Sequence, residues 1–290
     1  LDGKHSILNQ QAEFYKGETF EPRKIVLQLG KNLLNFETSY LLQNKVTLIG
    51  DDKVLDPIKT YWKKGKYDKL NKKILDKVVK YGDVWEFVYL DGNKIKSHLI
   101  NAENGFEVVS PSNEYLAFIE HYTIDGVSYY TVYEKETVTE YNNSGGELKL
   151  TGSYNNLSKT LPIRYRKESE TNERIGRSSL QDYIPILDEM ERLISKFSES
   201  FYKHHNPFFY VQGQKLTNES IDPSLVGAVL QLDDGASLNS VQTKLDYQSF
   251  KTIWETLTQQ LLTIANVPAV TFSKVEISNI SETSLKLLYS

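Results

Sequence analysis

The chain has 290 residues, of which 39% are hydrophobic and 25% are charged, and its formal net charge is −4. This composition excludes an intrinsically disordered chain and a uniformly basic nucleic-acid clamp. The absence of cysteine excludes a disulfide framework, and no apolar run approaches the roughly 20 residues of a membrane-spanning helix. The first residue is Leu1 rather than Met, so we expect an excerpt of a longer protein.

The first third of the chain is predicted to be mainly helical. An irregular arm, residues 1–24, precedes helices over 25–44, 55–62 and 66–81 and a short strand over 46–49. Residues 59–80 hold nine lysines and two aspartates, a net +7, which leaves −11 for the rest of the chain. A solvated helix face is the simpler interpretation, but these lysines could also form a basic contact face for nucleic acid or an acidic partner: Lys66, Lys69, Lys73, Lys77 and Lys80.

The sequence changes character at Gly82, where short β-branched and aromatic runs alternate with Gly, Asn and Pro turns. This pattern predicts closely spaced hairpins. We expect a mostly antiparallel sheet module over 82–166 that rests on the preceding helices, followed by a polar linker over 167–177. The predicted strands are 84–90, 94–100, 106–109, 116–124, 127–134, 137–141 and 161–166.

Two long helices are predicted in the second half. Residues 178–206 carry apolar residues at steps of three and four, and Pro185 indicates that the regular part begins near Ile184. A second helical stripe of apolar residues, or seam, runs over 247–265, and Val267-Pro268 ends the helix. Between the helices we expect a small segment with strands at 208–211, 229–232 and 238–241 and a short helix at 225–228.

No catalytic motif is present. The chain has no phosphate-binding G-x-x-x-x-G-K-[ST] loop, no H-E-x-x-H and no G-x-S-x-G. His204 and His205 are adjacent on a helix and so face different directions, and the carboxylates of Asp188, Glu189 and Glu191 are typical of the polar side of an interface helix. We therefore expect no catalytic residue, no metal site, no cofactor and no enzymatic activity.

The order of several short motifs resembles the portal proteins of tailed bacteriophages, above all those of siphophages of Gram-positive hosts. No single motif is specific, and one departure is Ser281-Glu282, where many relatives have Ser-Gly. The resemblance covers essentially the whole chain and rests on 176–180, 182–189, Asn206-Pro207, 234–236, 266–268 and 279–286.

The resemblance implies an α+β fold with a division of labour along the chain. Residues 1–175 would form an α/β wing, 176–206 and 247–268 the two stem helices, and 207–246 a small α/β clip. Residues 269–279 would form a tunnel loop, and 280–290 would start a long helix, with the C-terminal crown absent.

The resemblance also implies a function and a set of partners. Portal proteins form rings, typically of twelve subunits, at one capsid vertex, and double-stranded DNA passes through the central channel. The expected partners are other copies of the chain, DNA bound without sequence preference, the terminase, head–tail adaptors, and the major capsid and scaffolding proteins. We expect a virion component assembled in the host cytoplasm, with no membrane.

Two sets of residues are expected to serve this function. Aromatic residues of the two long helices, Phe197, Phe201, Phe250 and Trp254, would pack helix against helix within and between subunits. Tunnel-loop residues Lys274, Glu276, Ser278 and Asn279 would lie on or near the DNA-facing loop and contact phosphates transiently. A mostly acidic subunit suits a conduit, because a strongly basic lining would hold DNA through many phosphate contacts.

Two other protein classes remain open at this point. One is a different structural head–tail or capsid adaptor with a similar helical stalk but without the tunnel loop. The other is a carbohydrate-binding adhesin module built on the tyrosine-rich strand at 128–133.

Overall fold

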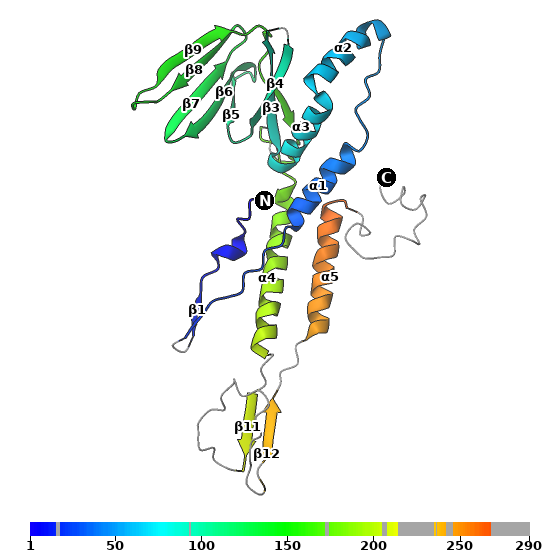
Figure 1. The fold of residues 1–290 in the computed structure, drawn as a ribbon, viewed down its shortest axis with the longest axis vertical. Coiled ribbons are helices and arrows are strands. Elements are labelled where there is room, and N and C mark those ends of the chain that lie inside the picture. The colour runs from blue at the N-terminus through cyan, green and yellow to red at the C-terminus, as the bar shows by residue number, and fades with distance from the viewer. Residues whose placement is uncertain are drawn as a thin grey trace. The chain divides into compact units, whose positions relative to one another are not determined.

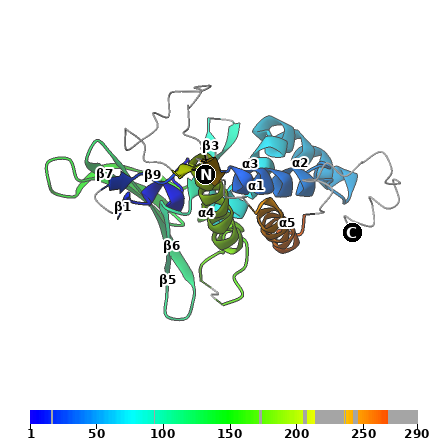
Figure 2. The same ribbon diagram turned by 90° about the horizontal axis from the view of Figure 1, so that it is seen from below.

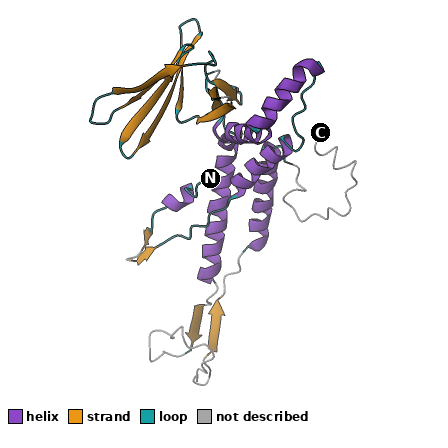
Figure 3. Cartoon of the chain, turned by 45° about the horizontal axis from the view of Figure 1, so that its top comes forward, coloured by secondary structure: helices purple, strands orange, loops and turns teal. Residues whose placement is uncertain are grey.

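The structure is a computed structural model that describes residues 1–15, 18–92, 94–171, 174–204, 208–213, 235, 237–241 and 246–267. It divides into two compact units. We call Gln28–Pro185 the sheet unit, and Leu1–Leu27 together with Ile186–Ser290 the helix unit. Figure 1 traces the chain through both units, and Figure 3 distinguishes helices from strands. The expected α+β class is confirmed, because helices and antiparallel sheets occupy separate stretches of the chain.

The sheet unit contains two antiparallel sheets. One has three strands in the order β10-β3-β4, formed by Ile163–Arg166, Asp83–Asp91 and Lys94–Asn101. The other is a five-stranded meander in chain order, with strands β5 (Gly105–Val109), β6 (Tyr115–Ile124), β7 (Val127–Tyr133), β8 (Thr137–Asn142) and β9 (Lys149–Asn155). The predicted antiparallel module is therefore two sheets.

Turn chemistry explains why the meander folds back so often. Between β6 and β7, Asp125 and Gly126 have φ values of 50° and 78°, the left-handed pair that a two-residue hairpin turn requires. Strand β9 was not predicted, because it is an edge strand whose residues are nearly all exposed and lack the alternation of a half-buried strand.

Side chains of β3 alternate between the two sides of the three-stranded sheet. Trp85 and Phe87 point toward the five-stranded sheet, where they join a buried cluster. Glu86, between them, points the other way and accepts hydrogen bonds from Tyr67 at the start of α3 (3.2 Å) and Tyr165 of β10 (2.7 Å). The three-stranded sheet therefore lies between the helices and the five-stranded sheet, an order that Figure 1 shows.

The core between the two sheets is a buried cluster, which we call the aromatic cluster. Trp85 and Phe118 lie with ring centroids 5.3 Å apart, and Phe87 and Tyr133 lie 4.6 Å apart, both in tilted arrangements that suit aromatic quadrupoles. None of the members exposes more than 5% of its surface: Trp85, Phe87, Ile100, Phe118, Tyr133 and Val138.

Two helices, α2 (Asp52–Gly65) and α3 (Tyr67–Tyr81), cover the other side of the three-stranded sheet, and α1 (Leu29–Leu41) packs against α3. Asp51 caps α2 by accepting the amide of Lys53 at 2.9 Å, and Lys66 turns the chain into α3 with a left-handed φ of 54°. The helices predicted at 55–62 and 66–81 are confirmed. The strand predicted at 46–49 is wrong, because this exposed run has no neighbouring sheet edge to pair with.

The helix unit is built on α4 (Leu180–His204), which begins in the sheet unit, and on α5 (Tyr247–Ile264). The prediction that regular helix begins near Ile184 is wrong. Pro185 lies inside α4, and the helix starts at Leu180 because the Ser178 hydroxyl accepts its amide at 3.2 Å.

The end of α5 follows from its last residues. Asn266 adopts a left-handed φ of 51°, its amide donates to the Thr263 carbonyl, and the amide of Val267 donates to the Leu262 carbonyl at 2.9 Å. This pair of bonds is the Schellman stop of a helix, and it explains why Asn266-Val267 ends the predicted seam.

Short elements complete the helix unit. The arm contains a 3₁₀ turn, η1 (Ser6–Asn9), and a hairpin of β1 (Glu13–Tyr15) and β2 (Glu18–Phe20), which the sequence pattern did not indicate. Strands β11 (Phe208–Gln212) and β12 (Ser237–Val241) pair antiparallel, as expected for two of the strands between the long helices. The strand predicted at 229–232 and the helix predicted at 225–228 lie outside the described residues.

Candidate functional site

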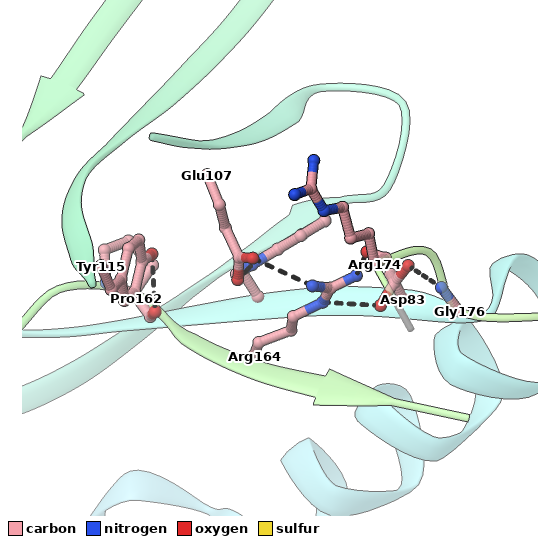
Figure 4. A network of polar contacts seen from close by, with 8 residues as sticks. Asp83, Glu107, Tyr115, Pro162, Arg164, Arg174 and Gly176 are labelled. Carbon is pink, nitrogen blue, oxygen red and sulfur yellow. Dashed lines mark hydrogen bonds and ion pairs between the residues drawn. The ribbon is translucent and has the colours of Figure 1, made fainter. Parts of the chain in front are cut away.

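A polar network fixes the chain where it enters α4 (Figure 4). The Arg164 guanidinium donates to Asp83 (2.8 Å), to Glu107 (2.9 Å) and to the carbonyl of Arg174 (2.7 Å). The second oxygen of Asp83 accepts the amide of Gly176 at 2.6 Å. These partners raise the pKa of Arg164 against the opposing effect of its burial, so the side chain stays charged. The segment predicted as a polar linker is thus bonded to the three-stranded sheet, and Arg164 of β10 ties that sheet to β5 of the other.

The same junction brings two backbones into direct contact. A Cβ placed on Gly176 would lie 2.2 Å from the Gly82 carbonyl oxygen, and Gly82 itself has a left-handed φ of 87°. The hydroxyl of Ser178 donates to the Lys80 carbonyl, and the amide of Ser179 donates to the Val79 carbonyl at 3.0 Å. The first turn of α4 therefore satisfies the free carbonyl groups at the end of α3.

The N-terminal arm is held by buried polar groups of α4. Backbone amides of Ile25 and Leu27 donate to Ser195 (3.0 Å) and to Glu191 (2.7 Å), and His5 contacts the same Glu191 oxygen at 2.8 Å. Glu191 is only 1% exposed. These bonds fix residues 25–27 on α4, and α1 begins at Leu29 rather than at Ile25 as predicted. The sequence offered one signal, a carboxylate and a serine four residues apart on one helix face.

Aromatic side chains connect α4 and α5 within one chain. The rings of Phe197 and Phe250 stack with centroids 3.9 Å apart, and Trp254 lies 6.1 Å from Phe250. None of these three is fully buried, and Phe201 is 48% exposed. These ring contacts therefore join three of the four predicted residues, and the role of all four between subunits stays a prediction.

The five predicted basic residues are not equivalent. Lys80 pairs with Asp76 at 2.8 Å, and Lys77 donates to Asn101. Lys66, Lys69 and Lys73 are exposed, and no ion pair joins any of them to another described residue. Lys69 and Lys73 border a hollow of about 620 Å³ between α1 and α3, together with Lys72 and the buried Thr38.

A larger cavity of about 880 Å³ lies at the edge of the aromatic cluster, between the two sheets. We call it the tyrosine pocket. The buried Glu120 accepts from Tyr133 at 2.8 Å and bonds His98 at 2.9 Å. Burial, followed by the charge of Glu120, raises the pKa of Tyr133, so the phenol remains a neutral donor. Of the tyrosines at 128–133, Tyr133 lines this pocket, but no sequence pattern indicated that Glu120 and Glu140 would line it too.

Several predicted positions cannot be compared with the structure. The tunnel-loop residues Lys274, Glu276, Ser278 and Asn279 lie outside the described residues, as does His205. Of the segment predicted to be the clip, the structure describes the strand pair β11-β12, Gly213, Gly235 and Asp246. Among the described helices, none is long and apolar enough to cross a membrane.

Comparison with known proteins adds family evidence. A family model described as "Phage portal protein, SPP1 Gp6-like" matches residues 1–290. A search of curated protein sequences finds no match.

Solved structures similar to this chain share its fold at low sequence identity. A chain from "Neck of empty GTA particle computed with C6 symmetry" is 12% identical with a TM-score of 0.53, covering 84% of this chain and 66% of that chain. A chain from "Neck of native GTA particle computed with C12 symmetry" is 12% identical with a TM-score of 0.52, covering 90% and 72%. A chain from "Virion of native gene transfer agent (GTA) particle" is 13% identical with a TM-score of 0.49, covering 81% and 64%. The chain thus spans about two thirds of the length of the virion chain and of the neck chain from the empty particle.

Proposed function

Because the chain belongs to the phage portal protein family, we propose that it is the subunit of a ring at one capsid vertex through which double-stranded DNA enters and leaves. The observation that carries the proposal is the family match over residues 1–290. The likeness in fold to neck chains, one of them solved with twelvefold symmetry, supports a ring of twelve. The adaptor and adhesin alternatives have no comparable support.

The proposed division of labour keeps the boundaries expected from the sequence. Residues 1–175 form the wing, 176–206 and 247–268 the stem, 207–246 the clip, 269–279 the tunnel loop and 280–290 the start of a long helix. The stack of Phe197, Phe250 and Trp254 supports a paired-helix stem, and the exposed Phe201 offers apolar surface to a neighbouring subunit.

The proposed contact with DNA is weak and transient. A duplex carries one charge per about 1.7 Å of its axis, and every neutralised phosphate adds a salt-sensitive contact. A subunit with a net charge of −4 limits the number of such contacts, which suits DNA that has to slide. In this proposal Lys274, Glu276, Ser278 and Asn279 touch phosphates briefly on the channel side.

The other proposed partners are those of a vertex component. Clip and stem meet the terminase during packaging and the head–tail adaptors afterwards, while the wing meets the major capsid and scaffolding proteins. The chain itself performs no chemistry in this proposal: the energy for DNA movement comes from the terminase. Assembly takes place in the host cytoplasm, and the mature ring is part of the virion.

Ring formation is the first test. The purified chain is measured by light scattering and imaged in negative stain. We expect closed rings of about a dozen subunits with a central hole. A compact dimer in every condition, with no ring, would overturn the proposal.

The tunnel-loop assignment needs a separate test. Lys274→Ala and Asn279→Ala are expected to alter DNA packaging or retention while rings assemble normally. The matched control is Lys251→Ala, an exposed lysine of α5 that pairs with Glu255 at 3.8 Å, and this change should leave both packaging and assembly unchanged. Loss of rings in the loop variants would contradict the assignment.

A further inference from the structure

The sheet unit separates its charges onto opposite faces. Residues 59–80, in α2 and α3, have a net charge of +7, whereas the five-stranded sheet, residues 105–155, has two lysines against eight carboxylates, a net charge of −6. The three-stranded sheet lies between them, as the alternating side chains of β3 require. Figure 2 shows the ribbon from below, with the strands of the five-stranded sheet on one side and α2 and α3 on the other. The two charged faces therefore cannot meet within one chain.

A cavity suited to a cation opens between the acidic five-stranded sheet and the three-stranded sheet. The tyrosine pocket is lined by four phenol rings and two glutamates, and no lysine or arginine is among its lining residues. Both oxygens of Glu120 have partners, in His98 and Tyr133. The carboxylate of Glu140, in contrast, forms no hydrogen bond or ion pair with any side chain that the structure describes.

Aromatic rings beside a carboxylate form a favourable site for an ammonium group. The ring face carries negative charge density and attracts a cation within about 6 Å of its centre, and a nearby carboxylate adds direct attraction. The pKa of Tyr154 is raised by burial and then by the charges of Glu140 and Glu120, consistent with a negative potential inside the pocket. The phenol rings belong to Tyr89, Tyr122, Tyr133 and Tyr154.

The basic face presents cations without partners. Lys69, Lys72 and Lys73 border the hollow between α1 and α3, and no described carboxylate forms an ion pair with any of the three. The only carboxylate at the hollow, Asp76, is bonded to Lys80. A lysine side chain is long and flexible enough to reach from such a surface into a pocket on another molecule.

We propose that the tyrosine pocket receives a lysine from the α2–α3 face of the next copy of this chain. Repeated from subunit to subunit, this contact would close a ring. This inference rests on the proposed ring. A closed ring is built from a heterologous contact, in which each subunit offers two different and complementary surfaces. Opposite charges on opposite faces of one unit satisfy that requirement, and charge complementarity also excludes contact between two like faces. The second copy is therefore the occupant that the charges favour.

The chain contains no cysteine, so introduced cysteines can be cross-linked selectively. We would prepare Glu140→Cys and Lys73→Cys as separate proteins, mix them and treat the mixture with a short bis-maleimide. Both positions are exposed, so neither change removes a buried contact. We expect a cross-linked dimer in the mixture at least tenfold above that in either protein alone. Ser112→Cys, in an exposed turn of the same sheet, replaces Glu140→Cys in the matched control.

Charge reversal provides the second measurement. Glu140→Lys and Lys73→Glu should each reduce formation of the cross-linked or ring species several-fold, and combining them as partners should restore part of it. High salt should weaken the contact, because exposed charges are screened.

The outcomes separate this inference from the proposed function. Rings without a cross-link above the Ser112→Cys control would overturn the pocket contact while leaving the portal proposal standing. A specific cross-link without rings would support the contact and count against the ring. Cross-linking of Glu140→Cys to itself would overturn the inference, because it would show like faces in contact.

Discussion

The two units of the chain use aromatic residues in different ways. In the sheet unit, Phe118 and Trp85 are enclosed between two sheets and expose 0% and 5% of their surface. In the helix unit, the stack of Phe197, Phe250 and Trp254 is only partly covered, and Phe201 is 48% exposed. One cluster is completed within a single chain, while the other leaves apolar surface uncovered. A subunit that assembles needs both kinds, because the first gives it a stable fold and the second gives it something to bury on assembly.

The largest expected effect breaks the enclosed cluster. Phe118→Ala should lower the free energy of unfolding by about 3–5 kcal/mol, because it leaves a cavity in a core that cannot collapse to fill it. Chemical denaturation followed by circular dichroism measures this loss. Phe106→Ala, on the neighbouring strand with 51% of the side chain exposed, is the control and should change stability by less than about 0.5 kcal/mol. Equal losses in both variants would contradict the comparison.

A second prediction concerns how the arm is held on α4. Glu191→Gln should weaken the bond to the Leu27 amide and cost about 1–3 kcal/mol, since a buried charged acceptor is replaced by a neutral one. Hydrogen exchange at Ile25 and Leu27 should accelerate, and protease should cut the arm sooner. Glu189→Gln removes an exposed ion pair with Arg192 and should change neither measurement. Unchanged exchange in Glu191→Gln would show that the arm is held in another way.

A third prediction sharpens the difference between fold and assembly. Trp254→Ala should cost the isolated subunit about 1–2 kcal/mol, less than a fully buried aromatic residue, because Trp254 is only partly covered within one chain. If neighbours cover the rest in a ring, the same change should reduce ring yield more than it reduces subunit stability. Ile253→Ala, at an adjacent residue that is 48% exposed, should leave the subunit's melting temperature unchanged. A ring yield that follows subunit stability in both variants would remove the proposed role of this surface.

The smallest expected effect concerns pH. The hydrogen bond to Glu120 raises the pKa of His98 above its usual value near 6.5. This contact therefore stabilises the fold fully below the unfolded pKa, and its contribution is lost as pH rises through the folded pKa. Because half of the His98 side chain is exposed, we expect only a few tenths of a kcal/mol. His98→Gln should flatten the slope of stability against pH above the usual imidazole pKa near 6.5. An unchanged slope would show that other groups cause it.

Most of the fold could be predicted from the periodic spacing of apolar residues and from turn residues. The helix at 66–81 and most strands after residue 82 were predictable, because turn residues and apolar spacing are local signals. The arm hairpin and the start of α4 were not, since Pro185 is a strong local signal that the capping by Ser178 overrides. The edge strand β9 has almost no buried side chains and so leaves no pattern to find.

The candidate sites were less predictable than the fold. Spacing alone identified Phe197, Phe250 and Trp254 as partners across two helices, because each lies on an apolar seam. The hydrogen bond that holds the N-terminal arm on Glu191 joins residues 164 positions apart, and the tyrosine pocket joins strands from both sheets. Such pairings depend on which elements meet in space, and a single sequence does not encode that in any local pattern.

The contact of Gly82 with Gly176 has a consequence for how the subunit folds. The bond beside it, from Gly176 to Asp83, closes a loop of 93 positions. Closing a chain of that length costs entropy that no local contact repays, so such contacts form after their surroundings are in place. We therefore expect the three-stranded sheet and the end of α3 to form before the residues that start α4 take up their final positions. A subunit arrested before that step would leave the Val79 and Lys80 carbonyl groups at the end of α3 without these hydrogen bonds. We expect such a subunit to aggregate more readily than a finished one.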